Sequence, residues 1–243
     1  MKSDSHSENP DLPSVSIVRT TPKVSQEKLF SFKRCYVGIS LDNPVFQGRS
    51  LEALLLWAVK NFEQCLVVIG DYLCRFNSGI FNGLNNDAAL KVAQEAGDSF
   101  ILRTSELFKQ FPRQKIHLTR WKPCLDSVEY RKSRAILDDL FVTDSNFRAS
   151  IEKDASSFAR RQTKRNHGPA VPMEEAIELS CQYLLEEIAV FSALSEQGWK
   201  VELYPGPELH VLVDTAKGKY SRIPQGLKER INVELRICEG KAD

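Results

Sequence analysis

A serine at the end of an apolar run is the first residue of this sequence that could carry out chemistry. The run "CYVGIS" ends at Ser40 and is followed by the polar stretch "LDN". A small residue such as Gly38 near the end of a strand lets another molecule approach the backbone. Ser40 is therefore a candidate nucleophile in the floor of a pocket, and an ordinary tight turn is the alternative explanation.

A tyrosine and a glutamate form the second candidate group. Tyr183 and Glu187 are four residues apart, so a helix would place them on the same face. They are in phase with the apolar residues Ile188 and Phe191. A buried carboxylate is costly unless it meets a cation or hydrogen-bond donors. Glu187 is therefore either a half-exposed residue at a helix edge or a carboxylate that binds an amine.

Motifs for nucleotide, metal and hydrolase sites are absent from the sequence. It contains neither G-x-G-x-x-G after the first apolar run nor G-x-x-x-x-G-K-[ST]. The motif G-x-S-x-G fails because "LDN" follows Ser40, and no histidine is an obvious partner for this serine. The four histidines lack the spacing of a metal site. We therefore expect no cofactor and no metal.

The composition indicates a globular protein without a strong overall charge. Apolar residues make up 42% of the 243 residues, and 33 basic and 32 acidic residues leave a net charge of +1. Nucleic acid could therefore bind only through a local basic patch. The apolar stretch 51–59 contains Glu52 and is too short to cross a membrane. The six cysteines show no C-x-x-C spacing and are expected to be free thiols.

The chain is expected to form one domain behind a leader. Residues 1–26 are polar and charged and lack the apolar segment of a signal peptide, which predicts a disordered leader and a cytoplasmic protein. Residues 27–243 contain no repeat and no linker rich in Gly, Ser or Pro, which favours a single domain.

The elements that must position the candidate residues alternate between strand and helix. Residues 34–70 read as a strand, a helix and a second strand, which is a βαβ unit. The further expected elements are helices near 85–110, 126–142 and 173–196, and strands at 115–121, 199–204, 208–214 and 231–237. This alternation predicts an α/β fold with a parallel sheet. Ligands of such sheets lie beyond the carboxyl ends of the strands, where Ser40, Asp71 and Tyr204 are expected to converge.

Four sequence stretches together resemble the tRNA-dependent cyclodipeptide synthases. They are "GISLDN" at 38–43, "GRSLEALLLWAVKNFEQCLVVIGDYLCRFN" at 48–77, "YLLEE" at 183–187 and "YPGPE" at 204–208. The resemblance extends from about residue 33 to about residue 239. It implies a Rossmann-like parallel sheet flanked by helices, similar to the catalytic domain of class I tyrosyl- and tryptophanyl-tRNA synthetases, without their ATP-binding signatures.

The resemblance also implies an activity. Members of this family use two aminoacyl-tRNAs to form a cyclodipeptide (2,5-diketopiperazine) by a ping-pong mechanism through aminoacyl-serine and dipeptidyl-enzyme intermediates. By this resemblance Ser40 is the nucleophile and Gly38 lines the same turn. Tyr183 and Glu187 hold the α-ammonium group of the aminoacyl unit, and Tyr204 acts in proton transfer and cyclisation.

The sequence leaves the substrate amino acids and the subfamily open. Asn43 matches the asparagine of one subfamily, whereas Pro205 matches the other. Val37, Leu185 and Leu203 are expected to line the first aminoacyl pocket, and their apolar character favours hydrophobic or small side chains. A monomer and a homodimer are both compatible with the sequence.

The tRNA-binding surface is expected in a basic stretch before the long helix. The segment 88–108 contains only Lys91 and Arg103 as basic residues, whereas "ARRQTKRNH" at 159–167 is much more basic. A solvated helix face is the alternative explanation for this charge. The expected tRNA-binding residues are Arg160, Arg161, Lys164 and Arg165.

Two alternative functions come from other classes. One is a non-catalytic α/β module that binds tRNA or a small ligand, but Ser40 and Glu187 are both present. The other is a serine acyltransferase or hydrolase that acts on another ester. It predicts turnover of generic esters without tRNA, whereas a cyclodipeptide synthase does not.

Overall fold

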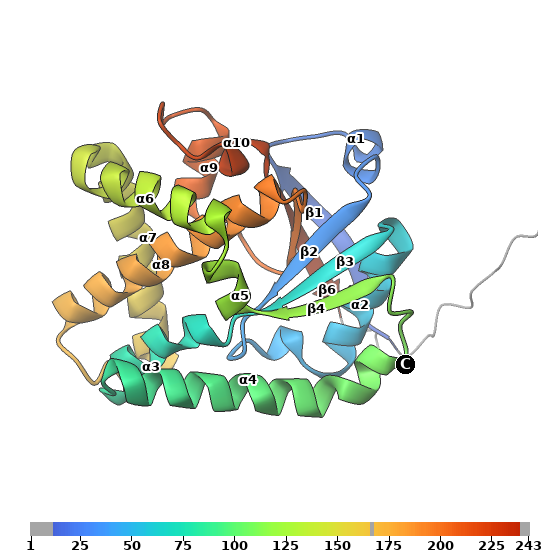
Figure 1. Cartoon of the computed structure of the whole chain (residues 1–243), viewed down its shortest axis with the longest axis horizontal. Coiled ribbons are helices and arrows are strands. Elements are labelled where there is room, and N and C mark those ends of the chain that lie inside the picture. Colours follow the sequence, from blue (N-terminus) through green and yellow to red (C-terminus); the bar gives the residue numbers. More distant parts are fainter. Residues whose placement is uncertain (1–11, 166–167, 239–243) are drawn as a thin grey trace, which may run out of the picture.

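The fold is built on a single mixed sheet, and Ser40 and Tyr204 lie at the carboxyl ends of two of its strands. The computed structural model describes residues 12–165 and 168–238, without the side chains of 162–165. The strands are β1 (Ser14–Thr21), β2 (Arg34–Ile39), β3 (Gln64–Ile69), β4 (Ile116–Arg120), β5 (Val201–Tyr204) and β6 (Ile231–Cys238). Their order is β1-β6-β5-β2-β3-β4, and all neighbours are parallel except β1 and β6 (Figure 1). The carboxyl ends of β5, β2 and β3 therefore lie at one edge.

Helices cover both faces of this sheet. They are α1 (Gln26–Phe30), α2 (Gly48–Asn61), α3 (Arg75–Asn82), α4 (Asn86–Lys109), α5 (Trp121–Leu125), α6 (Val128–Thr143), α7 (Ser145–Arg165), α8 (Met173–Glu196), α9 (His210–Ala216) and α10 (Gln225–Glu229). Two 3₁₀ turns, η1 (Pro44–Phe46) and η2 (Tyr72–Cys74), follow β2 and β3. Among the described helices, none has both the length and the apolar character needed to cross a bilayer.

Alternation along β2 divides the core into two clusters. Cys35, Val37 and Ile39 pack with the buried residues of α2 on one face. Tyr36 belongs to the second cluster on the other face, which contains the apolar residues of α8. Successive residues of a strand point to opposite faces, which explains this division.

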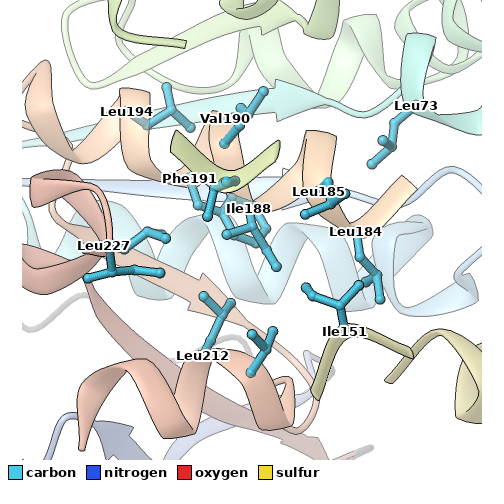
Figure 2. Packing of buried hydrophobic residues seen from close by; sticks show 14 of the residues in the cluster. Leu73, Ile151, Leu184, Leu185, Ile188, Val190, Phe191, Leu194, Leu212 and Leu227 are labelled. Carbon is cyan, nitrogen blue, oxygen red and sulfur yellow. The ribbon is translucent and has the colours of Figure 1, made fainter. Parts of the chain in front are cut away.

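The helix α8 is the centre of the second cluster. Figure 2 shows Leu184, Leu185, Ile188 and Phe191 of α8 close to residues from η2, α7, α9 and α10. Most residues of its second half are buried, from Leu184 to Ser195. A helix that is buried on nearly all sides leaves little room for polar side chains, so each one in its interior requires a partner.

The bounds of α8 agree with the expectation of a helix over 173–196. Pro172 stands at the N-cap position, and Glu174 and Glu175 lie in the first turn, where acidic residues favour the helix dipole. Gly198 follows the helix with φ +91°, a left-handed conformation that glycine adopts without strain.

The prediction of a disordered leader over residues 1–26 is wrong for its second half. Ser14–Thr21 form β1, which pairs antiparallel with β6. Val15 and Ile17 of this strand pack against the α2 cluster while Ser14 and Ser16 are exposed. This alternation was hidden by the polar composition around it. Residues 1–11 lie outside the described part, and the single domain over 27–243 stays a prediction.

The predicted strand at 208–214 is also wrong, because this segment contains α9 instead. Its buried residues are Val211, Leu212 and Thr215, a helical spacing. Short apolar runs do not distinguish a strand from a helix by periodicity alone. The side chain of Asp154 on α7 accepts a hydrogen bond from the Val211 N–H at 3.0 Å and so fixes the first turn of α9.

Candidate active site

Ser40 lies where β2 ends, in the middle of the sheet. β2 pairs with β5 on one side and with β3 on the other, so Ser40 is flanked by the ends of both strands. The Gly70 N–H donates to the Ile39 carbonyl at 2.9 Å, which continues the pairing to the last residue of β2. Ser40 itself is half-buried. The candidate nucleophile is therefore at the expected edge and is not sealed in the core.

Open space lies beside Gly38. A Cβ atom built on this glycine would meet no other heavy atom within 4 Å. Because side chains alternate along the strand, Gly38 faces the same side as Tyr36, which packs with α8. A group of a bound molecule could occupy this space next to the backbone that leads to Ser40.

The loop after β2 is fastened at two points. The Asn77 side chain on α3 donates to Asp42 Oδ2 at 3.2 Å. Asn43 Oδ1 accepts from the Val45 N–H at 3.1 Å and so caps η1. These contacts hold the backbone on the C-terminal side of Ser40.

Tyr183 and Glu187 contact each other on α8. The Tyr183 hydroxyl donates to Glu187 Oε1 at 3.3 Å. The tyrosine ring stacks on Phe158 at 5.4 Å between centroids and meets the edge of Phe76 at 6.2 Å. Rings on two other helices therefore fix the tyrosine, and the tyrosine in turn orients the carboxylate.

The environment of Glu187 disfavours its negative charge. Burial and then the Glu202 carboxylate raise the pKa of Glu187 to about 8, with a smaller contribution from Glu208, while the hydrogen bond from Tyr183 and the charge of Arg230 lower it. Among residues 12–165 and 168–238 it has no salt bridge. A carboxylate without its own cation gains most from a ligand that brings a positive charge.

Tyr204 lies near both the serine loop and Glu187. It ends β5, and its ring lies 6.1 Å from that of Phe46 in η1. Burial, and then the charges of Glu187 and Glu202, raise the pKa of Tyr204 to about 12, while a hydrogen bond with the Asn43 side chain lowers it. The hydroxyl is therefore a neutral proton donor near the loop that carries Ser40.

The expected apolar pocket of Val37, Leu185 and Leu203 is not formed as predicted. Val37 and Leu203 are fully buried in the α2 cluster, whereas Leu185 belongs to the α8 cluster on the other face of the sheet. Val37 has the opposite side-chain direction from Gly38, because neighbouring strand residues alternate. The three residues cannot line one cavity, and only Leu185 lies on the face of Gly38 and Glu187.

Two of the four predicted tRNA-binding residues can be placed. Arg160 and Arg161 are exposed near the C-terminal end of α7. The charge of Arg161 is close enough to lower the pKa of Tyr204, so this end of α7 lies beside the site. The side chains of Lys164 and Arg165 lie outside the described residues.

Sequence reasoning missed a buried charged cluster next to the site. Arg230 Nε donates to Glu202 Oε2 at 2.6 Å, and its Nη1 donates to Glu208 Oε2 at 2.7 Å. The Tyr36 hydroxyl donates to Glu202 Oε2 at 2.8 Å. Glu202 lies in a short run that is otherwise apolar, and Glu208 ends the stretch "YPGPE"; both were signals of a buried polar contact.

One pocket in the described part of the chain lies apart from this site. A pocket of about 490 Å³ lies along the ends of β3 and β4 and is lined by Asp71, Tyr72, Gln94 and Arg120 among others, but by none of the predicted catalytic, substrate-binding or tRNA-binding residues. No group of three metal-binding side chains occurs in the described part of the chain. The arrangement at Ser40 brings a serine hydroxyl, a tyrosine hydroxyl and a carboxylate together.

Comparison with known proteins gives a consistent result. A model of the cyclodipeptide synthase family matches residues 20–196 of this chain. The comparison with curated proteins gives no significant match. Among solved structures, a cyclodipeptide synthase (CDPS) from Fluoribacter dumoffii is 22% identical to this chain and has a TM-score of 0.79. The match covers 93% of this chain and 98% of that chain.

Two further solved structures are similar at lower identity. One is a Mycobacterium tuberculosis protein, described as demonstrating that cyclodipeptide synthetases are related to type I tRNA synthetases; it is 13% identical, with a TM-score of 0.69 over 93% of this chain and 97% of that chain. The other, from Candidatus Glomeribacter gigasporarum, is a cyclodipeptide synthase bound to Phe-tRNAPhe; it is 17% identical, with a TM-score of 0.58 over 84% and 87% of the two chains. The predicted Rossmann-like α/β fold is confirmed.

Proposed function

The chain belongs to the cyclodipeptide synthase family, and from this premise we propose that Ser40 is the nucleophile through which it joins two aminoacyl groups. The observation that carries this proposal is the convergence of the Ser40 loop, Tyr204 and the Tyr183–Glu187 pair. The Asn43 side chain and the charge of Glu187 both act on the pKa of Tyr204, so the loop, the tyrosine and the carboxylate lie near one another. The substrates are aminoacyl-tRNAs.

In the first step Ser40 Oγ attacks the ester carbonyl of an aminoacyl-tRNA. The bond from this carbonyl to the terminal ribose oxygen breaks, and the serine proton leaves with the tRNA. An aminoacyl ester is already activated, so positioning and a modest nucleophile suffice and no ATP is needed. The open space at Gly38 supports an approach of the substrate along the backbone of β2.

The ammonium group of this aminoacyl unit is held by Glu187, which Tyr183 orients. The contact supplies the cation that Glu187 lacks among the described residues. A charge-assisted hydrogen bond of this kind contributes about 1.5–3 kcal/mol. An ester without an ammonium group would leave the Glu187 carboxylate without a cation. The site therefore favours esters of amino acids.

Two acyl transfers complete the reaction. The ammonium group of the Ser40-bound aminoacyl unit gives a proton to Glu187, and the resulting amine attacks the ester of a second aminoacyl-tRNA. A peptide bond forms, the surplus proton of the amine passes to the ribose oxygen, the second tRNA leaves, and a dipeptidyl-enzyme remains. Its free amine then attacks the serine ester carbonyl, which closes the diketopiperazine ring and returns the serine oxygen. Tyr204, neutral because its pKa is about 12, can pass a proton to the leaving oxygen in this step.

The exposed end of α7 is proposed as part of the tRNA-binding surface. Arg160 and Arg161 are exposed, and Arg161 lies near Tyr204. The structure of the Candidatus Glomeribacter gigasporarum synthase contains Phe-tRNAPhe, which supports aminoacyl-tRNA as the substrate class. Basic side chains at this position would contact the phosphates close to the acylated end.

Trapping of the acyl-enzyme tests this proposal. The protein is incubated with a tRNA carrying a labelled amino acid, quenched in acid and digested, and the peptide containing Ser40 is examined by mass spectrometry. We expect the label on Ser40 in the wild type and on no residue of Ser40→Ala, and a cyclodipeptide only from the wild type. Release of labelled free amino acid in place of a cyclodipeptide, or turnover of a generic ester without tRNA, would favour a hydrolase.

A further inference from the structure

Three consecutive residues at the start of α3 contact both parts of the proposed site. Arg75 and Phe76 contact α8, and Asn77 contacts the loop that follows β2. Successive residues of a helix point about 100° apart, so a single turn can reach in different directions at once. None of these three residues is among the predicted catalytic residues. They join two segments that lie more than one hundred residues apart in the sequence.

The first contact is a two-point salt bridge between α3 and α8. Arg75 Nη1 donates to Glu186 Oε1 at 2.9 Å, and Nη2 donates to Oε2 at 2.5 Å. Both side chains are largely buried. A contact of this kind fixes the orientation of the two groups as well as their distance. Because Glu186 directly precedes Glu187, the start of α3 is held against the part of α8 that carries the carboxylate of the site.

The second contact leads from Arg75 to the tyrosine of the site. Its guanidinium group lies over the ring of Phe76 at 4.1 Å and over the ring of Tyr72 at 4.6 Å. The Phe76 ring in turn meets the Tyr183 ring edge-on, with 6.2 Å between the centroids and an angle of 71°. Both kinds of contact depend on direction. Phe76 therefore restricts the ring whose hydroxyl donates to Glu187.

The third contact reaches the loop that carries the serine. Asn77 Nδ2 donates to Asp42 Oδ2 at 3.2 Å. A carboxylate only accepts hydrogen bonds, so the NH₂ group of the amide must face Asp42. Asn77 Oδ1 is buried and has no hydrogen-bond partner among the described residues. A buried acceptor without a donor lowers stability, so stability alone does not explain an asparagine at this position.

We propose that the first turn of α3 sets the separation between the Ser40 hydroxyl and the Glu187 carboxylate, with Phe76 as the positioning residue on the carboxylate side and Asn77 on the serine side. This inference rests on the proposed function. A single carbon atom separates the ester carbonyl of an aminoacyl unit from its nitrogen. The serine and the carboxylate must therefore stand at a fixed spacing to act on one unit. Phe76 and Asn77 themselves touch no reacting atom.

The test compares acylation of Ser40 by aminoacyl-tRNA and by the matching α-hydroxyacyl-tRNA, which has a hydroxyl in place of the ammonium group. Phe76→Leu keeps an apolar side chain but removes the ring edge. In single-turnover reactions we expect its rate constant to fall about tenfold with aminoacyl-tRNA and by less than about twofold with hydroxyacyl-tRNA, because only the ammonium group uses Glu187. Asn77→Ala should slow both substrates by the same factor, because both need the serine in place.

The controls separate positioning from stability. Phe76→Tyr keeps the ring and should keep the wild-type ratio of the two rate constants. Phe30→Leu removes ring contacts with Trp57 and Phe62 at the amino end of β2, far along the strand from the serine, and should change neither rate constant. A folded Phe76→Leu that slows both substrates equally, or neither, overturns the inference. A Leu variant that fails to fold also overturns it, because Phe76 then serves stability alone.

A double variant tests whether Phe76 acts through the tyrosine. Tyr183→Phe removes the hydroxyl that orients Glu187. In this background Phe76→Leu should reduce the preference for aminoacyl-tRNA by less than about twofold, because the chain of contacts is already broken. An effect as large as in the wild-type background overturns the proposed route through Tyr183.

Failure of this inference differs from failure of the proposed function. If the wild type is never acylated on Ser40, the proposed function fails. A wild type that is acylated equally well by both substrates contradicts the ammonium site at Glu187. If the wild type prefers aminoacyl-tRNA and Phe76→Leu keeps that preference, only the role of α3 fails.

Discussion

The Tyr183 hydroxyl lies 3.3 Å from Oε1 of Glu187, one helical turn further along α8, while the preceding Glu186 has entirely different partners. Glu186 forms a two-point salt bridge with Arg75, with contacts of 2.9 and 2.5 Å, and accepts from the Trp121 indole N–H at 3.1 Å. Two consecutive glutamates of one helix thus differ in charge compensation. Glu186 is paired with a cation of the protein, whereas Glu187 has no cationic partner among the described residues.

Glu187→Gln should change the pH dependence of stability. The pKa of Glu187 is raised to about 8 in the folded protein, above its value in an unfolded chain, so the folded state holds this proton more tightly. The stability linked to this proton is present at low pH and is lost as pH rises through about 8. We expect Glu187→Gln to unfold at higher denaturant concentration than the wild type near pH 9, and this advantage to shrink towards about pH 5. Equal shifts at both pH values would contradict the raised pKa.

Glu186→Ala should destabilise the protein much more than Glu187→Ala. The substitution leaves Arg75, with a side chain only 14% exposed, and the Trp121 N–H without their acceptor. Loss of one partner of a buried ion pair costs about 3–5 kcal/mol. Urea unfolding at neutral pH measures the difference, and similar midpoints for the two variants would show that Glu187 is equally engaged within the fold.

Gly38→Ala should fold normally and react poorly. The added methyl group meets no heavy atom within 4 Å, so the melting temperature is expected to stay near that of the wild type. The same methyl group would occupy space proposed for the aminoacyl unit, and acylation of Ser40 should slow by about tenfold or more. Gly79→Ala on α3, where a Cβ makes ordinary contacts at 3.7 Å or more, is the matched control. Full activity of Gly38→Ala would show that the substrate does not occupy this space.

Asn77→Ala should lower kcat more than it raises KM. It removes the hydrogen bond to Asp42 that fastens the loop after Ser40. A misplacement of the nucleophile by about 1 Å can reduce the rate by about 100-fold without loss of substrate binding. Asn61→Ala, which removes a hydrogen bond within α2, serves as the control, and single-turnover acylation is the measurement. Equal rates in the two variants would show that the loop keeps its position without Asn77.

Charge reversal at Arg160 and Arg161 should weaken tRNA binding in a salt-dependent way. If both side chains contact phosphates, their replacement by Glu raises KM for aminoacyl-tRNA at low salt and reduces the slope of log KM against log salt by about one for each lost contact. The exposed pair Arg131 and Lys132 on α6 provides a control of equal charge. If the control pair produces the larger change, tRNA binds along α6 instead.

The sequence predicted those elements whose pattern is long or continuous. The helix α8 agrees with the prediction of a helix over 173–196, because proline precedes it, glycine follows it and its apolar pattern extends over several turns. The continuous apolar run "CLVVI" is of the kind found in buried parallel strands, and it is β3. In contrast, β1 depends on pairing with β6, more than two hundred residues away, as the contact of Arg19 with Glu234 shows. Local pattern carries no information on such a partner.

Part of the site could also be predicted from the sequence. The resemblance to the cyclodipeptide synthases identified Ser40, Tyr183, Glu187 and Tyr204, and the structure brings their elements to one edge of the sheet; their catalytic roles stay predictions. The apolar lining was wrong at Val37, because being close to Ser40 in sequence does not decide which face of a strand a side chain occupies. Arg230 could not be inferred, since it meets its two glutamates only after β5 and β6 have paired.

The pairing of β5 between β2 and β6 also bears on biosynthesis. Ser40 leaves the ribosome early, with β2, β3 and β4, whereas the strand that carries Tyr204 and the arginine that braces its turn are made some 160 residues later or more. Until then one edge of β2 is an unpaired strand edge of the nascent chain, which is prone to aberrant association. The proposed site is therefore complete only after Arg230 has been made, and a chain that ends before Tyr204 carries the serine without the other groups of that site.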